Sequence, residues 1–191
     1  MLRAMALILV ASAARGAEQQ PPPAEEPALD FHLLGEPKPP LKVDQSALRR
    51  RRTLLTLHQG AGMGLFAVAL ANTIVGQLNY SDRFASGPST GRYQLAHQIT
   101  AYGTLGVFGA TGLLALLAPR PLPRSPGLDR IWWHKLTIGA AAAGMVAEAV
   151  LGIWTARREG YLNQPDLAAD HLAIGYFTFV AISTSVGVIV F

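Results

Sequence analysis

The 191-residue sequence contains no cysteine, and this absence excludes several classes of protein. Without thiols the chain cannot form disulfides, thiolate metal sites or the thioether links of c-type haem, and it cannot carry a lipoprotein anchor. Charged residues are also scarce, at 15% of the chain, whereas 50% of the residues are hydrophobic. The formal net charge of +4 is modest and sits at the ends of apolar segments. It therefore indicates membrane orientation and gives no sign of a nucleic-acid partner.

The hydrophobic residues are concentrated in four blocks, which cover residues 54–78, 95–118, 131–155 and 171–191. Each block is long enough to cross a bilayer as a helix, which needs about 20 residues. In lipid every backbone polar group must be bonded within the protein, so only helices and closed barrels can span. We therefore predict that residues 49–191 form an all-α, integral membrane four-helix bundle surrounded by membrane lipid.

The first 48 residues differ from the rest of the chain. Residues 1–17 combine an early basic residue, Arg3, with a short apolar run and small residues near position 17. This pattern is typical of a secretory signal peptide, and a disordered apolar leader is the alternative. Residues 18–48 are rich in proline and carboxylates, which predicts an extended, disordered tail. His32 lies in this tail and is treated as unrelated to the histidines of the apolar blocks.

Two signals disagree about orientation. A cleaved signal peptide would leave the tail outside the cytoplasm, whereas the positive-inside tendency would put it in the cytoplasm. Because a leader and a Pro-rich acidic tail are common in exported segments, we expect a multi-pass protein of a bacterial-type inner membrane with its tail outside. The basic residues are Arg49, Arg50, Arg51, Arg52, Arg120, Arg124, Arg130 and Lys135 on the tail side, and Arg83, Arg92, Arg157 and Arg158 on the other.

Each apolar block has one histidine near its start, namely His58, His97, His134 and His171. Consecutive spanning helices run in opposite directions, so the start of a block alternates between the two membrane faces. We therefore predict that His58 and His134 share one leaflet and that the other two histidines share the opposite leaflet.

A weak internal repeat supports this pairing. A unit with an even number of spans repeats in parallel, so its halves are related by an axis along the membrane normal. The predicted two-fold pseudo-repeat of helices 1–2 and 3–4 places paired histidines at one depth, on opposite sides of the bundle axis. The repeat aligns His58 with His134, Asn72 with Glu148 and Gly76 with Gly152 at one offset, and His97 with His171, Tyr102 with Tyr176 and Thr104 with Thr178 at another.

This arrangement suits two haem irons on the bundle axis. Neutral imidazole is a good axial ligand for haem iron, and helical bundles supply such ligands from facing helices. Glycines near each histidine leave space for a porphyrin. At a rise of about 1.5 Å per residue, the two layers would lie roughly 20 Å apart. We predict two haem b groups, one bound by His58 and His134 and the other by His97 and His171.

Three alternatives remain. A histidine at a helix end is commonly an interfacial residue, and the chain would then be a structural or assembly membrane subunit without a cofactor. Zinc or copper on two histidines per layer would be underligated, because zinc normally takes three or four protein ligands. A metal transporter is disfavoured, because acidic residues are nearly absent from the apolar blocks.

The histidines stand in the contexts Leu-His-Gln-Gly, Ala-His-Gln-Ile, Trp-His-Lys-Leu and Asp-His-Leu-Ala. With this placement, residues 54–191 resemble the cytochrome b561 family of four-helix dihaem membrane cytochromes. In that family the first core helix pairs its histidine with the third, and the second pairs with the fourth. Members often have one or two further helices, so their ascorbate or ferric-reductase roles are not carried over.

The resemblance implies transmembrane electron transfer with a quinone or a periplasmic redox carrier as partner. It leaves open an oxidoreductase activity, and also a homodimer or a larger redox complex. The sequence contains no sign of a nucleophile, phosphate loop or dinucleotide fingerprint. No catalytic residue is therefore assigned.

Glu148 is the one carboxylate within the four apolar blocks. It lies about 40° from His134 on a helical wheel and roughly 21 Å further along the axis, which predicts an inward position near the second histidine pair. Asn72 has the same relation to His58. Either residue is expected to orient an axial imidazole, to accept a proton coupled to electron transfer, or to fix helix packing.

Arg157 and Arg158 close the third apolar block. Guanidinium groups at this position can pair with haem propionates or with an anionic substrate. The commoner role of such residues is to flank a span. Both interpretations remain open at this point.

Overall fold

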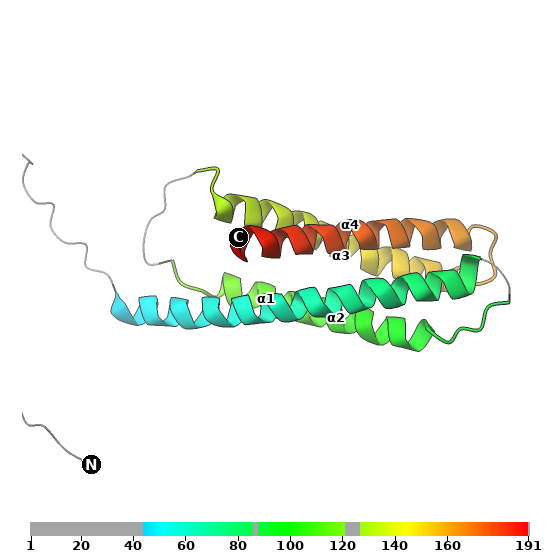
Figure 1. The fold of residues 1–191 in the computed structure, drawn as a ribbon, viewed down its shortest axis with the longest axis horizontal. Coiled ribbons are helices and arrows are strands. Elements are labelled where there is room, and N and C mark those ends of the chain that lie inside the picture. Colours follow the sequence, from blue (N-terminus) through cyan, green and yellow to red (C-terminus); the bar gives the residue numbers. More distant parts are fainter. Residues whose placement is uncertain (1–43, 86–87, 121–126, 191) are drawn as a thin grey trace, which may run out of the picture. The chain divides into compact units, whose positions relative to one another are not determined.

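The computed structural model describes residues 44–85, 88–120 and 127–190 (Figure 1). The predicted signal peptide at 1–17 lies outside the described residues. So do His32, Arg124 and the predicted tail up to position 43.

Four long helices make up most of the described chain, and a short π-helical segment continues the first of them. Each of the four is long and apolar enough to cross a membrane. The described chain is therefore all-α, as predicted, with four candidate spans. The elements are α1 (Gln45–Tyr80), η2 (Ser81–Ala85), α2 (Gln94–Leu116), α3 (Arg130–Arg157) and α4 (Gln164–Val190).

The outer surface of these helices is apolar. Ile74, Leu113, Val146 and Phe177 are each more than half exposed, at 53%, 57%, 67% and 53%. Water would penalise an apolar surface of this extent, whereas lipid tails solvate it. The exposed side chains therefore suit a bundle that is surrounded by lipid.

Helix α1 begins earlier than hydrophobicity alone suggests. The carboxylate of Asp44 accepts hydrogen bonds from the backbone N–H of Ser46 at 2.8 Å and of Ala47 at 3.3 Å, which is an N-cap. The hydrogen bonds from Ser46 lower the pKa of Asp44, so the cap is ionised at neutral pH. The helix thus starts four residues before position 49, and Arg49–Arg52 lie on it.

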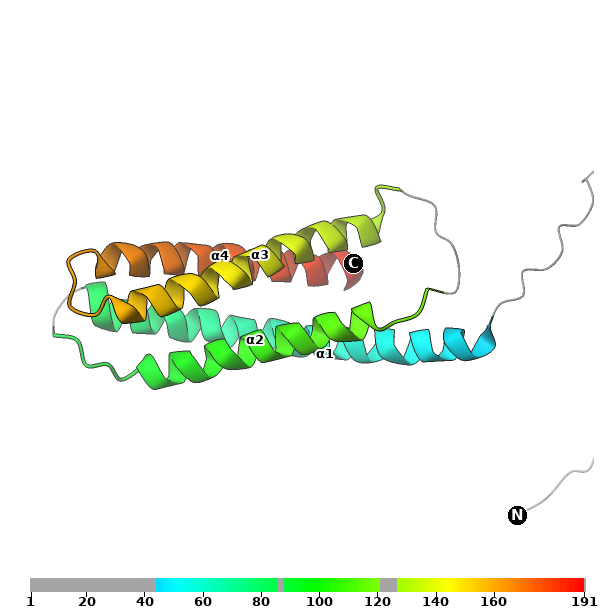
Figure 2. The same ribbon diagram turned by 180° about the vertical axis from the view of Figure 1, so that it is seen from behind.

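The helices form two antiparallel hairpins. Helix α1 packs against α2, and α3 packs against α4, while α1 also contacts α4. Figures 1 and 2 show the α1–α2 pair lying alongside the α3–α4 pair. A small core forms near the middle of the bundle, with Leu65, Ala69, Ala141, Ala181 and Ile182 buried.

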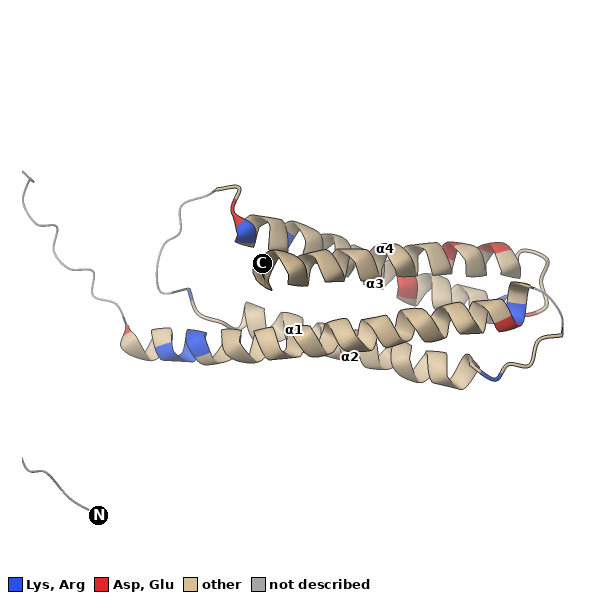
Figure 3. Ribbon diagram, viewed as in Figure 1, with Lys and Arg blue, Asp and Glu red and all other residues tan. Residues whose placement is uncertain are grey.

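The bundle has two ends, which differ in charge (Figure 3). We call the end with the start of α1 and the start of α3 the N-terminal end, and the end with η2 and the start of α4 the η2 end. Arg49–Arg52 and Arg130 lie at the N-terminal end, whereas the η2 end carries both signs, with Asp82, Asp166 and Asp170 beside Arg83 and Arg157. Glu148 lies on α3, away from both ends of that helix.

Candidate functional site

At the N-terminal end of the bundle, His58 of α1 faces His134 of α3. Their ring centres are 6.0 Å apart and their planes cross at 84°. Nδ1 of His58 lies 2.8 Å from the carbonyl oxygen of Thr111 on α2. Nδ1 of His134 lies 3.1 Å from the carbonyl oxygen of Ser185 on α4 and 2.7 Å from its hydroxyl. We call this pair the His58/His134 layer.

These contacts determine which ring nitrogen carries the hydrogen. A carbonyl oxygen can only accept, so Nδ1 of each imidazole must be the donor. The neutral ring then leaves Nε2 unprotonated, with a lone pair available to a metal. A backbone carbonyl on the far nitrogen is also a common partner of histidines that bind metals.

At the η2 end, His97 of α2 faces His171 of α4. Their ring centres are also 6.0 Å apart, with the planes at 67°. Each ring packs against a glycine of the preceding helix. A Cβ at Gly76 would lie 3.2 Å from Cε1 of His97, and a Cβ at Gly152 would lie 3.3 Å from Cε1 of His171. The two glycines thus provide the space that the imidazoles of this His97/His171 layer occupy.

The structure brings together the residues that the sequence analysis paired. Thr111 and Ser185, which contact the first layer, lie 14 residues after His97 and His171 on the same helices. At about 1.5 Å per residue this corresponds to roughly 21 Å along the bundle. The two layers therefore lie near opposite ends of the bundle. Their role as ligands stays a prediction.

The spacing within each pair fits two imidazoles that share one metal ion. A metal–imidazole bond of about 2 Å on each side, with roughly 1 Å from each bonding nitrogen to its ring centre, puts the centres about 6 Å apart. Among the described residues, no group of three or more histidine or carboxylate side chains could hold a metal ion. Two opposed imidazoles are too few for a zinc site, but they are the donor set of a bis-histidine haem.

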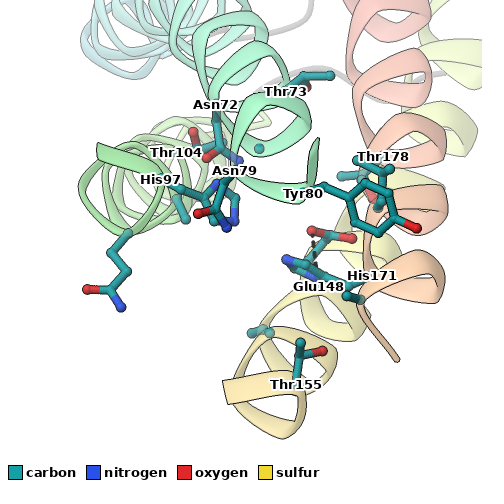
Figure 4. Close-up of a pocket in the computed structure, with 18 of the residues that line it drawn as sticks. Asn72, Thr73, Asn79, Tyr80, His97, Thr104, Glu148, Thr155, His171 and Thr178 are labelled. Atoms are coloured by element: carbon teal, nitrogen blue, oxygen red, sulfur yellow. Dashed lines mark ion pairs between the residues drawn. The ribbon is translucent and has the colours of Figure 1, made fainter. Parts of the chain in front are cut away.

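A cavity of about 580 Å³ surrounds the His97/His171 layer (Figure 4). Its volume is within the range of roughly 300–1,000 Å³ that is usual for sites of small ligands and cofactors. Toward the middle of the bundle it is lined by Ala69, Met145 and Ile182. Toward the η2 end its lining turns polar, with Asn79, Arg83, Gln94, Thr155, Arg157 and Gln164.

Several buried polar atoms in this cavity lack a partner. Buried polar groups in proteins are almost always hydrogen-bonded, so each exception needs an explanation. In the described part of the chain, five buried side-chain atoms make no hydrogen bond, and all five belong to residues that line this cavity. They are Asn79 Oδ1, His97 Nδ1, Glu148 Oε1, Thr155 Oγ1 and His171 Nδ1. Their concentration in one cavity makes this cavity the candidate functional site.

Glu148 lies in this cavity, with Oε2 3.2 Å from Nδ1 of His171. A Cβ at Gly175 on α4 would lie 3.5 Å from both carboxylate oxygens, so this glycine lets the carboxylate lie against the helix. Asn72 also lines the cavity. Its Oδ1 accepts a hydrogen bond of 2.9 Å from the Thr100 hydroxyl. The inward position predicted for both residues is thus observed, and Glu148 alone is in contact with a histidine.

The arginines at the η2 end are arranged differently from the prediction. Arg157 lines the cavity, whereas the Arg158 guanidinium lies over the ring of Tyr161, 5.2 Å from its centre. Arg83 lines the cavity as well and pairs with Glu159 at 2.6 Å. The structure therefore brings Arg83 and Arg157 to the site, and it does not place Arg158 there.

Besides Arg83, sequence reasoning missed four residues whose polar atoms contact the histidines or lie unpaired in the cavity. Thr111 and Ser185 bind the imidazoles of the first layer, and Asn79 and Thr155 place unpaired atoms in the cavity. Their signal was available in the sequence. Thr111 aligns with Ser185 at the offset that aligns His97 with His171. Asn79 aligns with Thr155 at the offset that aligns Gly76 with Gly152.

Comparison of the chain with protein-family models, with curated proteins and with solved structures finds no match. Membership of the cytochrome b561 family is therefore a proposal, and it depends on the histidine geometry.

Proposed function

We propose that this protein is a four-helix membrane cytochrome of the b561 type, which transfers electrons across the bilayer through two bis-histidine b-type haems. The observation that carries the proposal is the pair of facing imidazoles, with centres 6.0 Å apart, at each end of the bundle. His58 and His134 would hold one haem, and His97 and His171 would hold the other. Haem iron supplies a reversible one-electron couple, and the chain fixes two of them at different depths.

Equivalent contacts in the two hairpins support a pseudo-two-fold relation between them. Thr111 receives the His58 hydrogen bond in the same way as Ser185 receives that of His134. Gly76 lies against His97 in the same way as Gly152 lies against His171. Under this relation, both hairpins contribute one histidine to each layer, so each iron would lie near the axis.

The cavity lining indicates how the chain would hold the cofactor of the His97/His171 layer. Apolar side chains toward the middle of the bundle suit the macrocycle. Arg83, Arg157 and the Thr155 hydroxyl at the η2 end suit the two propionates, because guanidinium groups and hydroxyls donate to carboxylates. Gly76 and Gly152 leave room for the imidazoles that would hold it.

The electron partner that we propose is a quinone in the lipid or a redox carrier at the membrane surface. Both can approach one end of a bundle whose outer faces are apolar. The same apolar faces suit a homodimer or a larger redox complex. If the protein has an oxidoreductase activity, its substrate is the electron partner, and electron transfer to or from that partner needs no separate catalytic residue.

Purified protein from haem-sufficient cells is expected to be coloured. Reduction with dithionite should give a sharp b-type absorption band, and a pyridine haemochrome assay should find two haems per chain, because each layer has one pair of axial ligands. A colourless preparation from such cells would reject the proposal. It would favour the structural or assembly subunit, in which the histidines are interfacial.

The proposed orientation puts the N-terminal tail outside the cytoplasm of a bacterial-type inner membrane. Four spans place both chain ends on the same side, so alkaline phosphatase fused after Phe191 should be active, since it folds only outside. A fusion after Gly160, in the loop between α3 and α4, should be inactive and serves as the control. The opposite result would show that the basic residues of the N-terminal end determine the orientation by the positive-inside tendency.

A further inference from the structure

The two histidine layers differ in what their Nδ1 atoms contact. In the His58/His134 layer both Nδ1 atoms face backbone carbonyl oxygens. In the other layer, Nδ1 of His171 lies 3.2 Å from a carboxylate oxygen of Glu148 (Figure 4). Nδ1 of His97 has no hydrogen-bond partner within the described part of the chain. One imidazole of the four is therefore in contact with an acidic side chain.

The contact between Glu148 and His171 is largely shielded from the surroundings of the bundle. The side chain of Glu148 is 18% exposed and that of His171 is 20% exposed. No lysine or arginine pairs with Glu148 among the described residues. A carboxyl group inside a membrane protein usually has a polar partner, and Nδ1 of His171 lies within reach of this one. The contact distance is that of a hydrogen bond, although the N–H is not aligned with the oxygen.

The aligned position on α1 provides no such carboxylate. Asn72 corresponds to Glu148 in the internal repeat, but its side chain is a neutral amide that is already bonded to Thr100 at 2.9 Å. The α1–α2 hairpin therefore has no counterpart of the contact between Glu148 and His171.

We infer that Glu148 is a positioning residue that gives the His97/His171 layer the lower reduction potential and so sets the direction of electron transfer. This inference rests on the proposed function. An iron on Nε2 would leave the hydrogen of His171 on Nδ1, 3.2 Å from the Glu148 carboxyl, and a hydrogen bond between them would make this imidazole a more basic ligand. A more basic ligand favours ferric over ferrous iron, because hydrogen bonding around the ligands tunes the potential. Electrons then pass favourably from the η2 end to the N-terminal end.

The direct test is a redox titration of variants that keep one haem each. His58→Ala retains the His97/His171 layer, and His97→Ala retains the other. With full-length protein in lipid nanodiscs, the haem that remains in His58→Ala should titrate at the lower potential. A higher potential for that haem would overturn the inference, whatever the behaviour of any Glu148 variant.

The role of Glu148 itself is tested in the His58→Ala protein. Glu148→Gln should raise the reduced-to-oxidised ratio at fixed potential at least tenfold, which for a one-electron couple is about 59 mV. The low-spin EPR signal should shift as well. Glu148→Asp should recover part of the effect, and Asp166→Asn, which removes an exposed carboxylate at the same end but outside the cavity lining, should leave the potential unchanged.

The outcomes separate the inference from the proposed function. Two bound haems with an unchanged potential in Glu148→Gln would overturn the role of Glu148 and leave dihaem electron transfer intact. Absence of haem from the unmodified protein would reject the proposed function. If Glu148→Gln fails to retain its haem, Glu148→Asp and the comparison of the two single-haem proteins still decide the question.

Discussion

Replacing His58 with alanine is expected to remove one haem from each chain and to leave the other in place. The imidazole of His134 faces His58 at 6.0 Å and would be left as the one protein ligand of that iron. The second layer lies near the opposite end of the bundle and shares no histidine with the first. His134→Ala should therefore give the same spectrum as His58→Ala, whereas His97→Ala and His171→Ala should share a different one.

A pyridine haemochrome assay measures this result as a fall to about half of the haem content, and EPR identifies the remaining low-spin signal. His32→Ala is the matched control, because that histidine lies in the N-terminal region and should not affect haem content. Loss of both haems from a single replacement would contradict independent layers. Different spectra for the His58 and His134 variants would contradict the pairing.

Gly144→Ala is expected to destabilise the contact between α3 and α4. A Cβ at this position would collide with the hydroxyl of Thr178 and would lie 3.1 Å from its Cβ. Both residues are buried, and the hydroxyl already donates to the carbonyl oxygen of Ile174 at 2.8 Å, so moving it breaks a hydrogen bond. Overpacking of this kind costs about 1–3 kcal/mol. The thermal unfolding temperature in detergent, followed by circular dichroism, should fall.

Two further variants make this prediction specific. Thr178→Ala combined with Gly144→Ala removes the colliding hydroxyl and should restore part of the stability. Gly109→Ala on α2 is the matched control, because no atom lies within 4 Å of the added Cβ. Alanine also favours a helix over glycine, so this control should be neutral or slightly stabilising. Equal stability of the Gly144 variant and the unmodified protein would show that the helices can move apart without cost.

The positions of the helices along the chain could be predicted, but their ends could not. The apolar blocks located all four helices because hydrophobicity over about 20 residues is sufficient to identify a span. Helix α4, however, begins at Gln164, before the block that starts at His171, and α1 begins at Gln45, before Leu54. Helix ends are determined by capping and by backbone hydrogen bonds. Polar residues can form both, so a helix can extend beyond its apolar block.

The approach of Glu148 to the second histidine layer could also be predicted, since the helical period fixes the direction of a side chain. The positions of the Arg83 and Arg158 side chains could not be predicted. Both stand near helix ends and lie over an aromatic ring, but Arg83 lines the cavity and Arg158 does not. Side chains beyond the regular part of a helix follow the loop, and the sequence period no longer determines their direction.

The sequence by itself determined four apolar segments, one histidine at a definite depth in each, and hence which histidines can meet. These properties depend on hydrophobicity and helical period, and both can be read from neighbouring residues. The tertiary structure alone decided the 6.0 Å spacing, the hydrogen bonds that leave Nε2 of His58 and His134 free, and the cavity with its unpaired polar atoms. Those properties depend on contacts between helices far apart in the chain, such as the backbone carbonyls that face the imidazoles and the glycines that lie against them. Such contacts leave little trace in the local pattern of residues.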